Sequence, residues 1–297
     1  MEKLALGPQD LLAENKRLIY ARLTGFGQEG IYSKRAGHDI NYVALSGLLS
    51  MLGWESDKRP SPPLNLIADF AGGSVLCALG IMMALAERTR SGQGQVVDCS
   101  MVAGSAYLAS WIFRGQGSQL WSNPRAKNFL DGGAFFYDTY ETKDGKWMAV
   151  GALEPQFYSQ LINGLGLDEE QVPQICSAED GERFRKLFAQ IFKSKTRAEW
   201  CEVFDGRDAC VTPILSLEEA ALNQHNIDNK TFSKNADGAF SPNPAPILSR
   251  TPAKTNFHKC NPGCGDDTEQ ILLNDLGYSK TDVERFEDLG AIMRNKL

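Results

Sequence analysis

The side chain best suited to acid–base chemistry is the imidazole of His38, one of three histidines in the chain. It follows Gly37 and opens an apolar run up to Leu52, which predicts a position at the start of a helix. The free N–H groups and the dipole of a helix N-terminus favour a negative charge there. Imidazole titrates near neutral pH, so it can remove a proton and return it. Position alone leaves a capping or packing role for His38 open.

Two carboxylates occupy similar predicted positions. Asp69 lies between apolar residues where a helix is expected to start, and Glu154 follows a predicted strand directly before Pro155. Carboxylates at helix N-termini are commonly caps, which is the competing interpretation for each. With His38 they suit the removal of a proton next to a carbonyl group, which needs a base and donors to the enolate oxygen. A histidine and an aspartate facing one carbon from opposite sides would invert that carbon, with Glu154 orienting the imidazole.

Other motifs have weaker support. The run GFGQEG at 25–30 has the letters of a dinucleotide-binding loop, but more loop follows it and no helix starts there. We therefore expect no nicotinamide or flavin site. His258, Cys260 and Cys264 could supply metal ligands, but no second pair at zinc-binding spacing accompanies them. We expect no metal site there.

Composition and charge limit the classes of function. The 297 residues suffice for one or two domains, and a net charge of -6 argues against a general nucleic-acid binder. Seven singly scattered cysteines are typical of free thiols in a reducing compartment. The first residues lack the apolar core of a secretory signal. The apolar stretch 70–86 is short for a membrane span, so we expect a buried core helix and no span.

Strands and helices are expected to alternate around these side chains, which is typical of an α/β fold. In the first part we expect strands at 17–24 and 95–100, and helices at 39–52, from Asp69 through the apolar stretch, and at 103–121. In the second part we expect a hairpin at 135–142 and 146–152, helices at 155–165, 183–193 and 197–204, and a strand at 209–215. Residues 223–261 are predicted to form a long connector before short helices at 268–276 and 280–289.

Six longer motifs carry a resemblance to a known family. They are ARLTGFGQ at 21–28, GHDINY at 37–42, PLNLIADF at 63–70, GQGQVVD at 92–98, DGG at 131–133 and GALEPQFY at 151–158. With these motifs the chain resembles the family III CoA-transferase superfamily over nearly its whole length. Within the superfamily it is most similar to the branch of racemases that act on 2-methylacyl-CoA thioesters.

The resemblance implies a reaction and a set of site residues. The chain would interconvert (2R)- and (2S)-2-methylacyl-CoA thioesters through an enolate, without a metal or redox cofactor. His38 and Asp69 would be the two acid–base residues, and Glu154 would be the partner of His38. The stretch Gly37-His38-Asp39-Ile40-Asn41-Tyr42 would contact the CoA of the substrate. The implied context is bile-acid synthesis and the breakdown of branched fatty acids.

The resemblance also implies an architecture and a location. A Rossmann-like CoA-binding domain, incomplete because the first residues resemble an internal stretch of the family, is expected at 1–110. A smaller α+β domain is expected at 111–222, and C-terminal helices that return to the large domain within 223–297. The subunits would form an interlocked homodimer with active sites between them. The terminal Asn295-Lys296-Leu297 differs by one residue from a peroxisomal import signal read by a receptor, so we expect a peroxisome or a mitochondrion.

Two alternatives stay open. A CoA transferase of the same superfamily uses the aspartate as a covalent nucleophile and does not require His38, whereas a pairing of His38 with Glu154 favours racemisation. A chain without the opening β–α units can instead be an inactive subunit that binds a full-length partner. Such a chain would expose a strand edge and an apolar face that a partner could cover.

Overall fold

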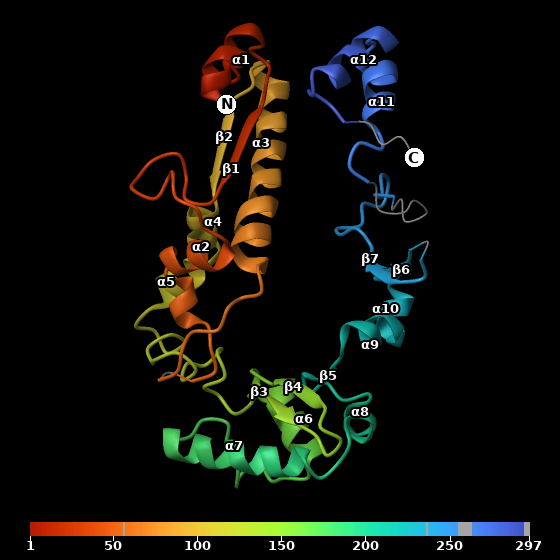
Figure 1. The fold of residues 1–297 in the computed structure, drawn as a ribbon. Coiled ribbons are helices and arrows are strands. Elements are labelled where there is room, and N and C mark those ends of the chain that lie inside the picture. Colours follow the sequence, from red (N-terminus) through yellow and green to blue (C-terminus); the bar gives the residue numbers. More distant parts are fainter. Residues whose placement is uncertain (56, 236, 255–262, 294–297) are drawn as a thin grey trace. The chain divides into compact units, whose positions relative to one another are not determined.

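The computed structural model describes residues 1–55, 57–235, 237–254 and 263–293, and its fold is mixed α/β (Figure 1). The chain divides into two compact units, Met1–Ile214 and Leu215–Leu297. Unit 1 holds two separate clusters of buried apolar side chains, one before and one after residue 110. The predicted domain boundaries at 110 and 222 stay predictions.

A pair of parallel strands organises the first half of unit 1. The strands β1 (Tyr20–Thr24) and β2 (Val96–Ser100) lie within a few residues of the predicted ones, and they pair in register along their full length. Two short helices precede them, η1 (Glu2–Leu4) and α1 (Pro8–Glu14). Parallel strands need a long crossover connection. Here the connection contains α2 (Asp39–Leu45), the 3-10 helix η2 (Leu48–Met51), the π-helix η3 (Leu66–Val75) and α3 (Leu76–Ser91).

The predicted helix at 39–52 is shorter in the structure. It ends at Leu45, and Gly47 takes a left-handed conformation with φ 85° before η2 begins. Glycine adopts positive φ without a steric penalty, so the chain turns at this point. The predicted helix at 103–121 is likewise divided, into α4 (Met101–Leu108) and α5 (Ser110–Gly115). Hydrophobic periodicity alone did not reveal either interruption.

The π-helix η3 packs directly against α4. A Cβ atom at Gly104 of α4 would lie 1.8 Å from the carbonyl oxygen of Gly72, so the two helices touch through their backbones and require glycine. Beside this contact Val43, Ala68 and Ala109 are buried together. π-helices are rare, and their single-turn form often occurs at functional sites. The buried contact between Val43 and Ala68 therefore places this irregular helix beside α2.

The stretch η3–α3, Leu66–Ser91, is long and apolar enough to cross a membrane by length and composition. The sequence predicts a buried core helix at 70–86, but only 22% of its most apolar window is buried within the structure. This prediction of burial was wrong, because hydropathy reports how apolar a side chain is and not what covers it. The exposed side chains include Phe70, Val75, Leu79, Met82 and Met83.

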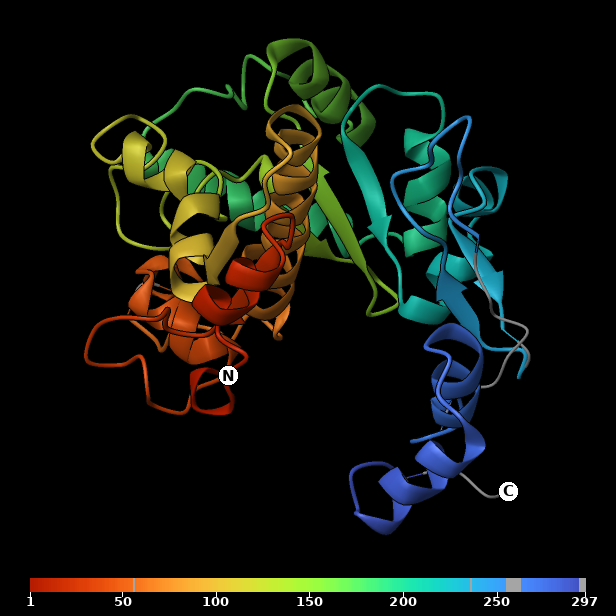
Figure 2. The same cartoon turned by 90° about the horizontal axis from the view of Figure 1, so that it is seen from above.

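A three-stranded antiparallel sheet organises the second half of unit 1, in the order β3-β4-β5. Its strands are β3 (Tyr137–Glu141), β4 (Trp147–Gly151) and β5 (Val211–Ile214), which confirm the predicted hairpin and strand. The predicted helices are also present, as α6 (Pro155–Leu165), α7 (Ala178–Phe192) and α8 (Arg197–Phe204). Figures 1 and 2 show α7 passing beside this sheet, and an aromatic cluster that includes Tyr158, Phe188 and Trp200 fills the space between them.

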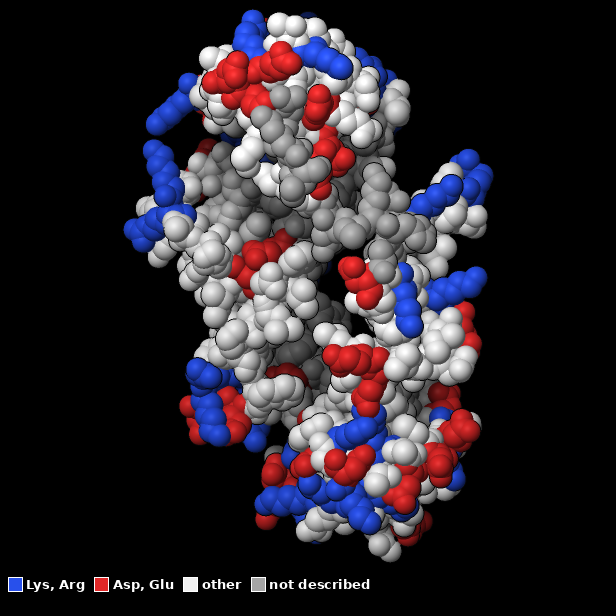
Figure 3. Space-filling model, turned by 45° about the vertical axis from the view of Figure 1, so that its right-hand side comes forward, with Lys and Arg blue, Asp and Glu red and all other residues white. Residues whose placement is uncertain are grey.

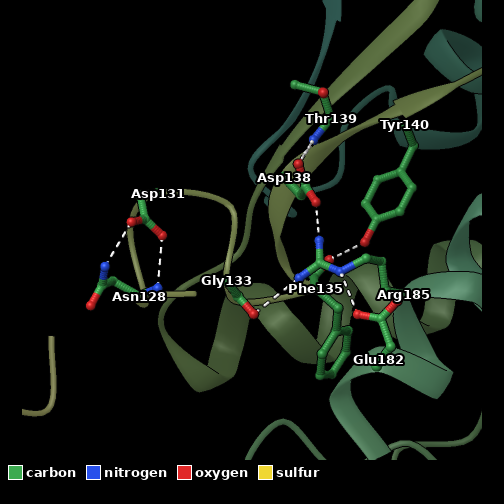
Figure 4. Close-up of polar contacts among 9 residues, drawn as sticks. All are labelled: Asn128, Asp131, Gly133, Phe135, Asp138, Thr139, Tyr140, Glu182 and Arg185. Carbon is green, nitrogen blue, oxygen red and sulfur yellow. Dashed lines mark hydrogen bonds and ion pairs between the residues drawn. The ribbon is translucent and has the colours of Figure 1, made fainter. Parts of the chain in front are cut away.

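A polar network joins α7 to the strand β3 (Figure 4). Arg185 forms an ion pair with Asp138 and donates a hydrogen bond to the carbonyl oxygen of Gly133 at 3.0 Å. Burial raises the pKa of the Asp138 carboxyl above its ordinary value, although the Arg185 charge acts in the opposite direction. In the preceding loop, Asp131 accepts the backbone N–H of Asn128 at 2.8 Å. These contacts fix the entry of the chain into the sheet.

Unit 2 contains more regular structure than the predicted connector. The expected terminal helices are present as α11 (Thr268–Gln270) continued by η4 (Ile271–Asp275), and as α12 (Lys280–Asp288). The stretch predicted to be irregular holds the helix α10 (Gln224–Asp228) and the antiparallel pair β6 (Phe232–Lys234) and β7 (Phe240–Pro242), after the helix α9 (Leu217–Leu222). Short strands such as β6 and β7 give too little alternation for a pattern to predict them.

Candidate active site

His38 is the N-cap residue of α2. Its backbone is extended, its N–H donates to Oδ1 of Asn41 at 3.0 Å, and its carbonyl oxygen accepts the N–H of Asn41 at 2.8 Å. Asn41 is the third helical residue, and its side chain binds the N–H of the N-cap residue as in one half of a capping box. The side chain of His38 is exposed. The cap therefore fixes the backbone of the histidine while the imidazole stays accessible for proton transfer.

Asp69 lies in the first turn of η3 and is half-buried. The first N–H groups of a helix have no partner within it. Two of them are bound by the carboxylate of Asp39, whose Oδ2 accepts the N–H of Ala68 at 2.7 Å and the N–H of Asp69 at 2.9 Å. Because Asp39 directly follows His38, these bonds hold the start of α2 against the start of η3. The structure thus brings together the backbones of the two predicted acid–base residues.

The sequence resemblance gave Asp39 a different role, as one of six residues that contact CoA. Its side chain is only 3% exposed and is bonded to η3. That side chain is therefore not presented to a ligand, and the rest of the stretch 37–42 stays a predicted CoA contact. Nothing in the sequence near Asp39 signals a bond to a residue 30 positions away.

Tyr42 of α2 contacts the residue that precedes His38 and the ring of Phe26. Its hydroxyl donates a hydrogen bond to the carbonyl oxygen of Gly37, the residue before His38. Its ring meets the ring of Phe26 edge to face at 4.9 Å between centroids. Burial raises the pKa of the Tyr42 phenol, and the negative charge of Asp69 raises it further. Tyr42 therefore interacts electrostatically with Asp69 and also braces the turn that carries the imidazole.

Glu154 is the N-cap residue of α6, with Pro155 in the first helical position. Its carbonyl oxygen accepts the N–H groups of Phe157 and Tyr158, each at 3.0 Å, and its side chain is exposed. Burial raises the pKa of the Cys210 thiol, and the charge of Glu154 contributes to that rise. Among the contacts of the described residues, none joins Glu154 to His38. The pairing of His38 with Glu154 therefore stays a prediction.

Unit 1 also contains a large apolar cavity of about 960 Å³. It lies between the segment that carries η2 and η3 and the sheet β3-β4-β5, with Trp54, Ile67 and Val150 among its lining residues. None of the three predicted site residues lines it. The cavity reaches the first turn of η3 through Leu66 and Ile67, but neither His38 nor Asp69 lines it.

The remaining sequence predictions about sites stay untested. Within the described ranges, no group of three or more His, Cys, Asp and Glu side chains is arranged to hold a metal ion. His258, Cys260 and the terminal Asn295-Lys296-Leu297 lie outside the described residues.

On the face of the molecule drawn in Figure 3, positive and negative side chains are interspersed. That face therefore offers no broad basic surface of the kind that binds nucleic acid.

Comparisons with known proteins place the chain among enzymes of CoA thioesters. Residues 1–268 match CoA-transferase family III. Over 297 residues the chain is 53% identical to the alpha-methylacyl-CoA racemase of Mus musculus and 52% identical to that of Homo sapiens, covering all of this chain and 77% of each relative. A crystal structure of a CAIB/BAIF family protein from Brucella suis has a TM-score of 0.69 and 21% identity, covering 85% of this chain and 67% of that one. The structural match shows the fold alone.

Proposed function

The chain belongs to CoA-transferase family III, and on this basis we propose that it is a racemase that interconverts (2R)- and (2S)-2-methylacyl-CoA thioesters. The observation that carries the proposal is its full-length homology, above half identity, to two racemases of that substrate class. The geometry supports it, because His38 and Asp69 stand at two helix starts that one buried carboxylate holds together.

The proposed reaction removes one proton from the α-carbon and delivers another proton to the opposite face of the same carbon. In one direction the neutral imidazole of His38 removes the α-proton, and the electron pair of the broken C–H bond moves onto the thioester oxygen as an enolate. Protonated Asp69 then forms a new C–H bond on the opposite face. In the other direction the two groups exchange roles, and exchange with solvent restores their starting protonation. N–H groups in the first turn of α2 would donate to the enolate oxygen.

We propose that the working form is a homodimer of interlocked subunits. Its support is that Glu154 has no contact with His38 within one chain, so the orienting carboxylate would come from a second copy. The exposed apolar side chains of η3–α3, among them Leu79, Met82 and Met83, also suit a protein partner.

We further propose that the fold consists of a Rossmann-like large domain and a smaller α+β domain. We also propose that the protein is located in the peroxisome or the mitochondrion.

A label experiment separates the racemase from the CoA transferase. The chain is incubated with one epimer of a 2-methylacyl-CoA in deuterated water, without an acceptor acid. We expect deuterium at the α-carbon and loss of stereochemical purity. Strict dependence of turnover on an acceptor acid would support transfer instead. Turnover together with one cooperative thermal unfolding transition would remove the alternative of an inactive subunit.

A further inference from the structure

The carboxylate of Asp39 is buried in a way that requires explanation. The residue is 3% exposed, and its Oδ2 accepts two backbone N–H groups, while its Oδ1 is buried with no hydrogen-bond partner among the described residues. A buried charge is unfavourable unless it is paired or fully hydrogen-bonded. A side chain kept there for packing alone would be better replaced by an apolar one. The two bonds to η3 are what this carboxylate provides.

Those bonds act on the two proposed acid–base residues together. One end of Asp39 is covalently joined to His38, and the other end binds the backbone N–H of Asp69 itself at 2.9 Å. The alternative path between the two residues runs along the chain and passes through Leu64, whose φ of 59° is left-handed, into a π-helix. The hydrogen bond from Asp39 joins the pair directly, without following that irregular path.

We propose that Asp39 is a positioning residue that holds His38 and Asp69 on opposite sides of one substrate carbon, an inference that rests on the proposed racemase function. Its carboxylate touches neither the substrate nor the reacting atoms. Proton exchange at the α-carbon needs one correctly placed group, whereas inversion needs two groups placed relative to each other. Loss of the Asp39 bonds therefore lowers inversion more than it lowers exchange.

Two substitutions separate the bond from the charge. Asp39→Ala removes the acceptor of both N–H groups. In Asp39→Asn the amide oxygen can take the place of Oδ2 and keep both bonds, and the amide nitrogen takes the place of Oδ1, which has no partner to lose. If Asp39 acts through its hydrogen bonds, Asp39→Asn should behave like the wild type. If it acts through its negative charge, Asp39→Asn should be as defective as Asp39→Ala.

Asp144 offers a matched control elsewhere in unit 1. Its Oδ1 also accepts two donors, the hydroxyl of Thr142 at 2.6 Å and the backbone N–H of Arg197 at 3.0 Å, and so ties the hairpin loop to the start of α8. Asp144→Ala removes the same number of bonds from an exposed carboxylate with no proposed role in proton transfer. It reports how much a purely structural loss changes the reaction.

The experiment measures inversion by chiral chromatography and α-deuterium incorporation by NMR, with one 2-methylacyl-CoA epimer in deuterated water. We expect Asp39→Ala to invert roughly a hundredfold more slowly, because a shift of about 1 Å at a reacting group has that effect. The ratio of inversion to exchange should fall at least about tenfold, and it should stay at the wild-type value in Asp39→Asn and Asp144→Ala. Amide hydrogen exchange at Ala68 and Asp69 should be faster in Asp39→Ala alone.

Two results would overturn the proposal, and they differ. A wild-type ratio in Asp39→Ala, with faster amide exchange at Ala68 and Asp69, would show that the bonds exist but do not position the pair, and the racemase function would stand. A wild-type protein that neither inverts nor exchanges 2-methylacyl-CoA epimers would overturn the proposed function and this inference with it.

Discussion

The hydroxyl of Tyr42 donates a hydrogen bond to the carbonyl oxygen of Gly37, immediately before the histidine that caps the same helix. A Cβ atom at Gly37 would lie 2.9 Å from Cε1 of the Tyr42 ring, so glycine at this position lets the ring approach the turn. The sequence motif GHDINY thus contains its own brace. Its glycine, histidine and tyrosine form one folded turn whose imidazole is accessible.

Tyr42→Phe should remove that brace and keep the ring contact with Phe26. The lost hydrogen bond should lower the free energy of unfolding by about 1 kcal/mol, because the Gly37 carbonyl oxygen keeps no equivalent partner. The rate of inversion should fall, since the substitution loosens the turn that carries the imidazole. Urea unfolding and steady-state kinetics measure the two effects. An unchanged rate with lowered stability would show that the brace serves folding only.

Subunit complementation tests the proposed origin of Glu154. His38→Ala and Glu154→Ala are each expected to be inactive, and the two chains are co-expressed. If the glutamate acts across subunits, each mixed dimer contains one site with both residues intact, so about a quarter of the wild-type activity should return in a random mixture. Pairing within one chain leaves every site defective. No recovery in a mixture shown to contain mixed dimers would contradict the interlocked arrangement.

The Asp138–Arg185 pair predicts a pH dependence of stability. Burial raises the pKa of Asp138 above 3.8 in the folded protein, so the folded state binds this proton more tightly than the unfolded state does. The contribution of this proton to the free energy of unfolding is therefore fully present below pH 3.8. It is lost as the pH rises through the raised pKa of the folded state. As the pH rises across this window, the free energy of unfolding of the wild-type protein should fall relative to that of Asp138→Asn. Denaturant unfolding at a series of pH values measures it, and a relative gain would contradict the raised pKa.

Gly104→Ala should destabilise unit 1 strongly. The added methyl group would lie 1.8 Å from the Gly72 carbonyl oxygen, which is backbone and cannot move aside without shifting η3. Overpacking of this kind costs about 1–3 kcal/mol or more. Gly181→Ala in α7 is the matched control, because the atom nearest to the added Cβ would lie 3.8 Å away. This substitution should raise the free energy of unfolding by about 0.5–1 kcal/mol. Equal unfolding midpoints for the two variants would show that the α4–η3 contact is looser than described.

Local signals explain which elements the sequence predicts well. The helix α6 starts at Pro155 and ends before Gly166 in a left-handed conformation, and both residues are standard end signals. The helix α8 starts with the capping box of Thr196 and Glu199. Each of these signals lies within a few residues of the element that it bounds. Prediction succeeds there because local chemistry alone determines the boundary.

Features that depend on distant contacts were not predictable in the same way. The π-helix η3 exists beside α4 because Gly72 and Gly104 allow backbone contact, and no local pattern specifies that pairing. The role of Asp39 depends on the N–H groups of η3, which one sequence cannot place. The sequence did identify His38, Asp69 and Glu154 as candidates from residue type and expected helix starts. It could not show that Asp39 joins the helix starts that carry the first two.

Initial-rate labelling of single variants tests the two-group mechanism most directly. Each epimer of a 2-methylacyl-CoA is incubated separately in deuterated water with the wild type, His38→Ala and Asp69→Ala, and both label and configuration are followed. We predict that the wild type forms inverted product carrying α-deuterium from either epimer. Each variant should form no inverted product and should exchange label with one epimer only. Inversion at the wild-type rate in either variant would contradict the account.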